Sequence, residues 1–447
     1  MLGKDEFARI AKSIIAMSKA EETEVMLFSS NSALTRFANN SISQNVSSSD
    51  DSISIRVVTA KKTGKAAVNT FDEASLREAV AKAEALMSQS HPDEEYVAMQ
   101  GKTTVANKAK LFYDATMAFG PMERAAVVTA LVKEATKINC EAGGIVSNGG
   151  SALGIANSHG LLQYIEGTTA DFSATVAAEN VSGWAEGHDR DIARINCAEL
   201  SQKALEGWKA SRNPRKIDPG KYDVILPPAA ASEFLMFLGW LGFTPVSYHE
   251  GTSPLSGKIG QKIFGDNITL VDDFSHPLSL GIPFDFEGTP RTPVTLVEKG
   301  VMKGIVYDRR SALKYGGKPT GHALPQPSAS GAFPGSMIMT GGHSSIKEMI
   351  AQTHRGILVT HLHYTNLVKP SDMTLTGMTR DGVFFVEDGK VAYPVNNMRF
   401  TDSIFRILSN VTAISKELEQ VEAFFGGSFV VPALKVKDFN FTSSTEF

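Results

Sequence analysis

The sequence predicts an α+β protein with a mixed α/β N-terminal domain followed by a mainly β C-terminal domain. Helical and strand-like patterns alternate irregularly, without the βαβ repeat typical of a parallel sheet. A polar stretch with Pro214, Pro219 and Gly220 interrupts these patterns after a predicted helix. The length of 447 residues suits two or three domains of ordinary size. We therefore place the N-terminal domain at residues 1–212 and the C-terminal domain at 213–447.

Within the N-terminal domain, apolar periodicity predicts helices and β-prone runs predict strands. Asp5 can cap a first helix, a second helix covers 76–87, and Pro121 opens a third. A fourth helix at 198–210 precedes the proposed boundary. Short strands are expected at 24–28, 33–37, 42–46, 52–59 and 65–70 and, with glycine-rich turns, within 141–179.

After residue 213, strands and turns dominate, and the longest predicted helix covers 229–242. It follows the strand-like run 222–226 and the pair Pro227-Pro228, which suits the first positions of a helix. Shorter helices are expected near Ser311 and at 345–352 and 402–408.

The longest loop-like stretch is rich in Gly, Pro and Ser and covers 318–342. Loops of this length in a compact domain often form lids or binding surfaces. Gly331 and Gly335 are therefore candidates for contacting a peptide or a partner protein. Asn157, His159 and His322 lie in glycine-bounded turns and join these candidates, with hydrogen-bonding roles expected rather than catalysis.

Composition argues against nucleic-acid and membrane partners. The net charge is only −4 and no Lys/Arg-rich run occurs, whereas nucleic-acid affinity rests on clustered basic residues. The apolar run 225–243 is interrupted by prolines, Ser232 and Glu233, so a membrane span is not expected. Two cysteines suit a reducing compartment, and residues 1–12 do not read as a signal peptide. We expect a cytoplasmic protein.

Several blocks in order along the chain resemble the TldD/PmbA family, once labelled modulators of DNA gyrase and regarded as peptidases and their partners. The resemblance implies a C-terminal domain whose strands form an open, barrel-like sheet. The blocks are Leu34–Gln44, Gly154–Gly160 with Ser173–Val176, Gly251–Gly257, Asp285–Pro290, Lys303–Ala323 and Val386–Val395.

The chain resembles the PmbA (TldE) branch of that family, because it lacks the metal helix of the TldD branch. In TldD-like chains the helix before the Gly-Thr-Ser segment carries His-Glu-x-x-x-His. Counting back from Gly251, these positions fall on Met236, Phe237 and Leu241, which cannot ligate zinc or move a proton. The peptidase branch also uses a C-terminal cysteine ligand, and the matching segment 424–429 has none. We assign no catalytic residue and no cofactor, and we expect zinc only in a TldD-like partner.

A different metal site could use His361 and His363, which lie in a β-prone run. Strand alternation places both on one face, at a spacing that can hold a transition metal. No third ligand is identifiable from the sequence.

Three functions remain open. The resemblance favours a non-metal, PmbA/TldE-like subunit of a TldD/TldE-type metallopeptidase complex that processes or degrades unfolded peptides. The alternatives are an independent hydrolase with a metal site relocated to His361 and His363, and a non-enzymatic homodimeric module that binds peptides or regulates. The partner is a TldD-like subunit or a second copy. We expect association through the C-terminal domain, because the segments 234–243 and 424–434 are too apolar to leave exposed.

Overall fold

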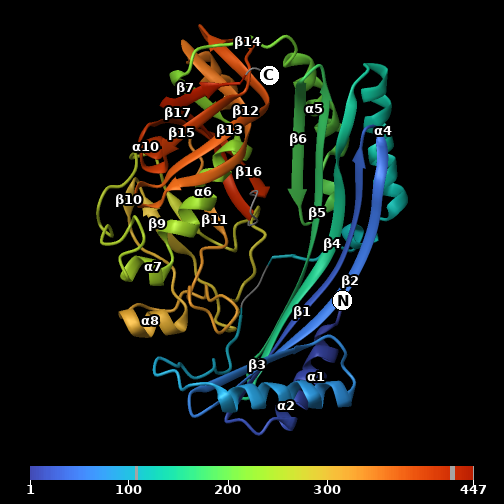
Figure 1. Cartoon of the computed structure of the whole chain (residues 1–447), viewed down its shortest axis with the longest axis vertical. Helices are drawn as coiled ribbons and strands as arrows, with labels where there is room; N and C mark the ends of the chain where they lie inside the picture. Colours follow the sequence, from blue (N-terminus) through green and yellow to red (C-terminus); the bar gives the residue numbers. More distant parts are fainter. Residues whose placement is uncertain (106–108, 423–427, 446–447) are drawn as a thin grey trace.

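The computed structural model describes residues 1–105, 109–422 and 428–445, and it contains two sheets (Figure 1). The six-stranded sheet has the order β3-β2-β1-β4-β5-β6 and is antiparallel throughout. Its strands are β1 (Glu22–Ala38), β2 (Ser41–Thr59), β3 (Lys62–Val68), β4 (Glu141–Asn157), β5 (Leu162–Ala178) and β6 (Val181–Asp189). The accompanying helices are α1 (Lys4–Met17), α2 (Glu73–Gln89), α3 (Asp114–Ala118), α4 (Pro121–Lys137) and α5 (Cys197–Ala210), with a 3₁₀ turn at Ile192–Arg194.

Two pairs of strands that the sequence predicts separately are each one long strand. The runs 24–28 and 33–37 both lie in β1, and 42–46 and 52–59 both lie in β2. The polar residues 29–32 break the apolar alternation that identifies a strand in a sequence. They stay extended because β1 pairs with β2 on one side and with β4 on the other along this stretch. The prediction of separate strands was wrong.

The helices cover one face of the six-stranded sheet, and the other face turns towards the C-terminal half. Val25 and Leu27 of β1 pack with α1 and α2, and Phe37 packs with α4 and α5 at the far end. Met26 points to the opposite face, because neighbouring strand residues alternate between faces. There it joins a small core with Phe284, which links the two halves of the chain.

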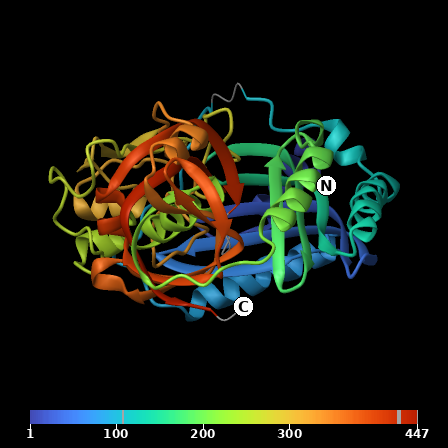
Figure 2. The same cartoon turned by 90° about the horizontal axis from the view of Figure 1, so that it is seen from above.

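The second sheet has eleven strands, and part of it closes into a ring. β17 pairs with β15 and also with β7, so β7, β12, β13, β15 and β17 form a barrel-like ring, seen from above in Figure 2. The expected α+β class with a barrel-like C-terminal sheet is confirmed. The strands are β7 (Gly220–Leu226), β8 (Leu270–Asp272), β9 (Val294–Glu298), β10 (Val301–Met302), β11 (Met337–Met339), β12 (Arg355–Lys369), β13 (Thr374–Glu387), β14 (Lys390–Pro394), β15 (Met398–Ser403), β16 (Val411–Glu422) and β17 (Ser428–Ser444).

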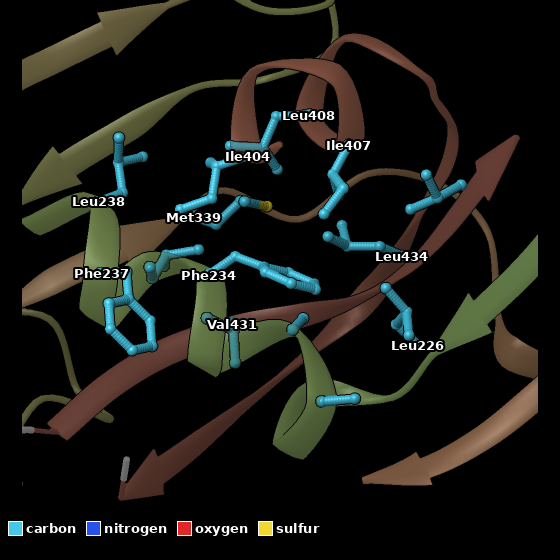
Figure 3. Packing of buried hydrophobic residues seen from close by; sticks show 14 of the residues in the cluster. Leu226, Phe234, Phe237, Leu238, Met339, Ile404, Ile407, Leu408, Val431 and Leu434 are labelled. Atoms are coloured by element: carbon cyan, nitrogen blue, oxygen red, sulfur yellow. The ribbon is translucent and has the colours of Figure 1, made fainter. Parts of the chain in front are cut away.

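The helix α6 (Pro228–Gly242) lies in the core of this barrel-like sheet. It packs against β12, β16 and β17, and Phe234 points into the core that Met339 and Leu434 also line (Figure 3). The ring centroid of Phe234 lies 6.3 Å from that of Phe400. Most side chains of α6 are buried, as expected of a helix that is apolar on nearly all its faces. The predicted helix 229–242 is therefore confirmed. The other helices of this half are α7 (Pro245–His249), α8 (Arg309–Tyr315), α9 (Ile346–Ala351) and α10 (Ile404–Ser409), with a 3₁₀ turn at Pro370–Asp372.

The two apolar segments expected at an association surface lie inside the fold. Within 234–243, Trp240 is exposed to 58% and Leu241 is partly buried, whereas the remaining side chains are buried. Residues 429–434 are buried in β17, and 424–427 lie outside the described residues. The described residues of these segments are apolar because most of them form the core, so apart from Trp240 they do not supply the exposed apolar surface that we expected. Association through the C-terminal domain stays a prediction. Among the residues described, no helix combines the length and apolar character needed to cross a membrane.

Candidate functional site

The positions that match the lost metal motif are held in the apolar core. Met236 and Phe237 are exposed to only 5% and 1%, and Leu241 packs against the same core cluster. The predicted loop at 318–342 passes over this helix, because Pro334 and Met337 approach Gly239 of α6. Thioether and hydrocarbon groups at these positions offer no ligand suited to zinc.

Asn157 and His159 hold a segment of the N-terminal half in place. The Asn157 side chain donates to the carbonyl of Gln100 at 2.7 Å and accepts from the backbone N–H of His159 at 3.0 Å. The His159 Nδ1 lies 3.2 Å from the carbonyl oxygen of Met99, and its Nε2 lies 3.3 Å from Glu22 Oε2. These contacts tie the turn after β4 to residues 99–100.

His322 ties the long loop to β8. Its Nε2 lies 2.8 Å from Asp272 Oδ1, and its Nδ1 lies 2.9 Å from the carbonyl oxygen of Thr320. Asp272 Oδ2 accepts from the backbone N–H of Ser336 at 2.8 Å. Burial alone would raise the pKa of Asp272. The hydrogen bond with His322 and the positive charge of His322 lower this pKa by more, so the pKa of Asp272 is below its usual value. His322 thus lies far along the chain from Asn157 and serves a separate part of the fold.

The two glycines of the long loop contact other elements than the Asn157 turn. Gly331 has a φ of +72° and lies against Pro245 and Asp308, whereas Gly335 lies beside the guanidinium of Arg291. The five predicted contact residues therefore form two groups, one at the turn after β4 and one in the 318–342 loop.

The turn after β4 meets the loop 285–289 at the junction of the two halves. Gly288 has a φ of +74°, and a Cβ added there would lie 2.4 Å from Leu161 Cδ2. The Thr103 hydroxyl donates to the Gly288 carbonyl at 3.1 Å. A residue larger than glycine would force these segments apart, so the close approach explains the glycine at position 288.

Three buried carboxyl groups gather behind this junction. Asp285 accepts from the backbone N–H groups of Glu287, Thr289 and Ala323, each at 2.9 Å. Glu287 Oε2 accepts from the backbone N–H of Arg309 at 3.2 Å, and Asp308 caps α8 through the N–H of Ser311. Burial, together with the charges of Asp285 and Asp308, raises the pKa of Glu287 to about 8. Burial also raises the pKa of Asp285, to about 6.

Sequence reasoning placed Asp285 and Glu287 only in a block of family resemblance. Their spacing of two residues within Pro-Phe-Asp-Phe-Glu-Gly was a signal, because carboxyl groups flanked by aromatic residues are placed near a core. Asp308 could not be joined to them, because the sequence does not show that α8 packs beside the 285–289 loop.

We expect the Glu287→Gln variant to remove a loss of stability that the native chain undergoes as pH rises. The folded state keeps the Glu287 proton up to about pH 8, whereas the unfolded chain releases it near the ordinary glutamate pKa of 4.5. Stability therefore falls between these pH values by up to about 1.4 kcal/mol per pH unit. Melting temperatures of both proteins from pH 5 to 8.5 test this.

As the pH rises from 5 to 8, the melting temperature of the native chain should fall relative to that of the Glu287→Gln variant. Below pH 4.5 Glu287 is protonated in both the folded and the unfolded chain, and above pH 8 it is ionised in both. The difference in melting temperature between the two proteins should therefore be constant outside this pH range. Parallel curves across the window would contradict the raised pKa.

A cleft of about 460 Å³ opens beside the carboxyl cluster, between the six-stranded sheet and the loop before β9. Phe28 of β1 is 42% exposed there, and its ring centroid lies 5.9 Å from that of Phe286. Concave, mostly apolar surfaces with a few polar groups are typical of ligand sites. The lining includes Leu111, Leu153, Ile165, Leu280 and Ile282 with the polar side chains of Asp50, Glu166 and Arg190.

Among the described residues, the histidine pair on β12 is not part of a three-ligand group. The His361 ring lies 4.3 Å from that of Trp184, and its Nε2 lies 3.4 Å from Asp381 Oδ2. His363 contacts the guanidinium of Arg380, a cation that opposes metal binding. Within the described parts of the chain, neither histidine belongs to a group of three potential ligands.

Comparisons with known protein families identify two matching domains. Residues 219–443 match the model described as the PmbA/TldA metallopeptidase C-terminal domain, and residues 23–86 match PmbA/TldA metallopeptidase domain 1. The metalloprotease PmbA of Escherichia coli O157:H7 is 26% identical over 311 residues, which are 67% of this chain and 65% of the relative. A PmbA homologue of Haemophilus influenzae is 23% identical over 412 residues, 87% of this chain and 86% of the relative.

Other relatives match over shorter parts of their length. An uncharacterised Methanocaldococcus jannaschii protein is 36% identical over 126 residues, which are 28% of this chain and 30% of the relative. A metalloprotease of Methanothermobacter thermautotrophicus is 26% identical over 296 residues, 62% of this chain and 63% of the relative. This chain therefore spans less than two thirds of the length of several of the relatives it matches.

Solved structures share the whole fold. TldE from Thermococcus kodakarensis superposes with a TM-score of 0.87 at 23% identity, covering 98% of this chain and 99% of that one. A modulator-of-DNA-gyrase protein from Thermotoga maritima gives a TM-score of 0.86 at 18% identity, covering 98% and 100%. These likenesses extend the shared architecture to both halves of the chain.

Proposed function

Because this chain belongs to the PmbA/TldD metallopeptidase family, we propose that it is the non-metal, TldE-like subunit of a two-chain peptidase. Its partner is a TldD-like chain that carries the zinc and the chemistry. This chain contributes scaffold and peptide-binding surface, and together the two chains process or degrade unfolded peptides.

The observation that carries this proposal is the environment of α6. Met236 and Phe237 are sealed in the apolar core, where neither water nor a peptide bond can approach. A peptidase metal needs three protein ligands and an open position for water. A chain that retains the fold while filling these positions with apolar side chains is suited to a supporting role.

The cleft at the junction supports the binding part of the proposal. It is mainly apolar, and Asp50, Glu166 and Arg190 provide a few charges at its margin. Unfolded segments expose apolar side chains, and the exposed Phe28 offers them an aromatic contact. Folded proteins bury such side chains, so the cleft favours unfolded substrates.

The decisive experiment compares the purified chain with its complex with a TldD-like partner. We expect the chain alone to cleave no unfolded peptide, and the complex to cleave it in a chelator-sensitive manner. Light scattering should show a heterodimer. Within the complex, Phe28→Asp should reduce cleavage, whereas Leu86→Asp, at a similarly exposed position on α2, should not.

Chelator-sensitive cleavage by the chain alone would instead support an independent hydrolase. A homodimer that binds peptides but ignores the partner would support the regulatory module.

A further inference from the structure

A second cluster of ionisable side chains joins the two sheets away from the carboxyl cluster at the junction. His188 of β6 has its Nδ1 2.8 Å from Asp171 Oδ1 of β5 and 3.8 Å from Glu422 Oε2 of β16. The three potential ligand atoms all lie within 4.8 Å of one another. β5 and β6 belong to the six-stranded sheet and β16 to the other, on the side that faces them (Figure 1).

The cluster has the outer contacts that characterise metal sites. The second nitrogen of His188, Nε2, is buried and lies 3.2 Å from Glu186 Oε2. The Ser147 hydroxyl donates to the other oxygen of Asp171 at 2.9 Å. In metal sites a carboxylate on the far nitrogen of a histidine fixes the ring, and hydrogen bonds orient the ligating carboxylates.

The charges of the cluster also favour a cation. Three carboxylates, of Asp171, Glu186 and Glu422, surround a single imidazole. Burial raises the pKa of Glu422, and the charges of Asp171 and Glu186 outnumber the opposing charge of His188. A proton on His188 would still leave the group with a net negative charge, which a divalent ion would neutralise.

We propose that Asp171, His188 and Glu422 bind one divalent first-row transition metal ion, with zinc or manganese best suited, and that this ion fastens β16 to the six-stranded sheet. One imidazole nitrogen with two carboxylates is a donor set for such ions rather than for magnesium alone. Glu186 acts as a positioning residue on the far side of the ring. The site departs from the expectation of a metal-free chain and is independent of the peptidase zinc.

The site is also reachable from solvent. A cleft of about 250 Å³ is lined by His188 and Glu186, by Glu419 and Gln420 of β16, and on its far part by the cationic side chains of Lys110, Arg190 and Arg194. The Glu422 side chain is 56% exposed, so water can complete the coordination of a bound ion. A site between two sheets that is open on one side can take up an ion after folding.

Metal and proton compete for the same nitrogen. Burial lowers the pKa of His188, but its hydrogen bonds with Asp171 and Glu186 raise it more strongly, to about 10. A metal must therefore displace this proton at neutral pH, and binding releases it.

The test is a titration of the full chain, freed of metal by a chelator and dialysed, with zinc, manganese or magnesium. Calorimetry and elemental analysis should give one zinc or manganese ion per chain, with magnesium much weaker. His188→Ala, Asp171→Asn and Glu422→Gln should each weaken binding at least about 100-fold, and Glu186→Gln by about 10–100-fold. Bound metal should raise the melting temperature of the native chain but not that of His188→Ala.

Two matched control variants test whether metal binding is specific to the proposed ligands. Glu419→Gln removes an exposed carboxylate from the same strand and cleft, and His361→Ala removes a partly buried histidine near Glu186. Both should bind metal like the native chain, and circular dichroism of the metal-free variants should match it.

No binding at pH 8, unchanged binding in His188→Ala, loss of binding in His361→Ala, or equal affinity for magnesium would each overturn the site. Peptide cleavage by the chain alone that survives His188→Ala would count against the proposed function and leave this site standing.

Discussion

The Phe237→Glu substitution is expected to lower the free energy of unfolding by at least about 4 kcal/mol. It reinstates the glutamate of the TldD-type motif at the matching position, but Phe237 is 1% exposed within an apolar core. An uncompensated charge in such a place costs about 3–5 kcal/mol, and the lost aromatic packing adds to this. Chemical denaturation followed by circular dichroism measures the change.

The matched control for this substitution is Trp240→Glu, three residues along the same helix. Trp240 is 58% exposed, so its glutamate can remain hydrated and should cost well under half as much. Equal effects at the two positions would show that α6 is not packed as the structure has it. A well-folded Phe237→Glu variant would also reopen the question of whether this helix can accept a metal.

The Glu24→Ala substitution is expected to cost about 3–5 kcal/mol, because it leaves a buried guanidinium without its carboxylate. Arg56 Nε and one terminal nitrogen donate to the two oxygens of Glu24 at 2.9 and 2.8 Å. Both side chains are at least nine-tenths buried. Without Glu24, the charge of Arg56 would also face that of Lys65 without relief.

Two comparisons separate this effect from a general loss of surface charge. Glu298→Ala breaks an exposed strand ion pair with Lys303 and should change stability by less than about 0.5 kcal/mol. Replacing Glu24 and Arg56 together by leucine and methionine should recover most of the loss, because no charge is left unpaired. If the double variant were as unstable as Glu24→Ala, the loss of stability would come from altered packing rather than from an unpaired charge.

Local patterns of the sequence predicted the parts of the fold that depend on nearby residues. The helix predicted at 229–242 forms α6 at Pro228–Gly242, because its apolar composition and its two leading prolines act within the segment itself. The middle of β1 was missed for the opposite reason. Its serine and asparagine residues are held in a strand by partners in β2 and β4 rather than by their own preferences.

The candidate sites also divide into parts set by local sequence and parts set by contacts between distant residues. The apolar residues at 236, 237 and 241 could be read from the sequence, because a motif is a local spacing. His188 and Glu422 could not be joined, since more than 200 residues separate them and only the packing of β16 beside β6 brings them together. The His361 and His363 pair was found by strand alternation, but the cation of Arg380 beside it came from β13.

The position of β17 in the chain has a consequence for how the protein acquires its structure. β17 pairs with β7, β11, β15 and β16, and its pairing of Phe441 with Gly220 joins residues more than 200 positions apart. The ring cannot close around α6 until this strand has left the ribosome. Contacts so distant in sequence slow folding and leave apolar segments exposed meanwhile. During synthesis, the apolar side chains of α6 therefore stay uncovered until β17 emerges.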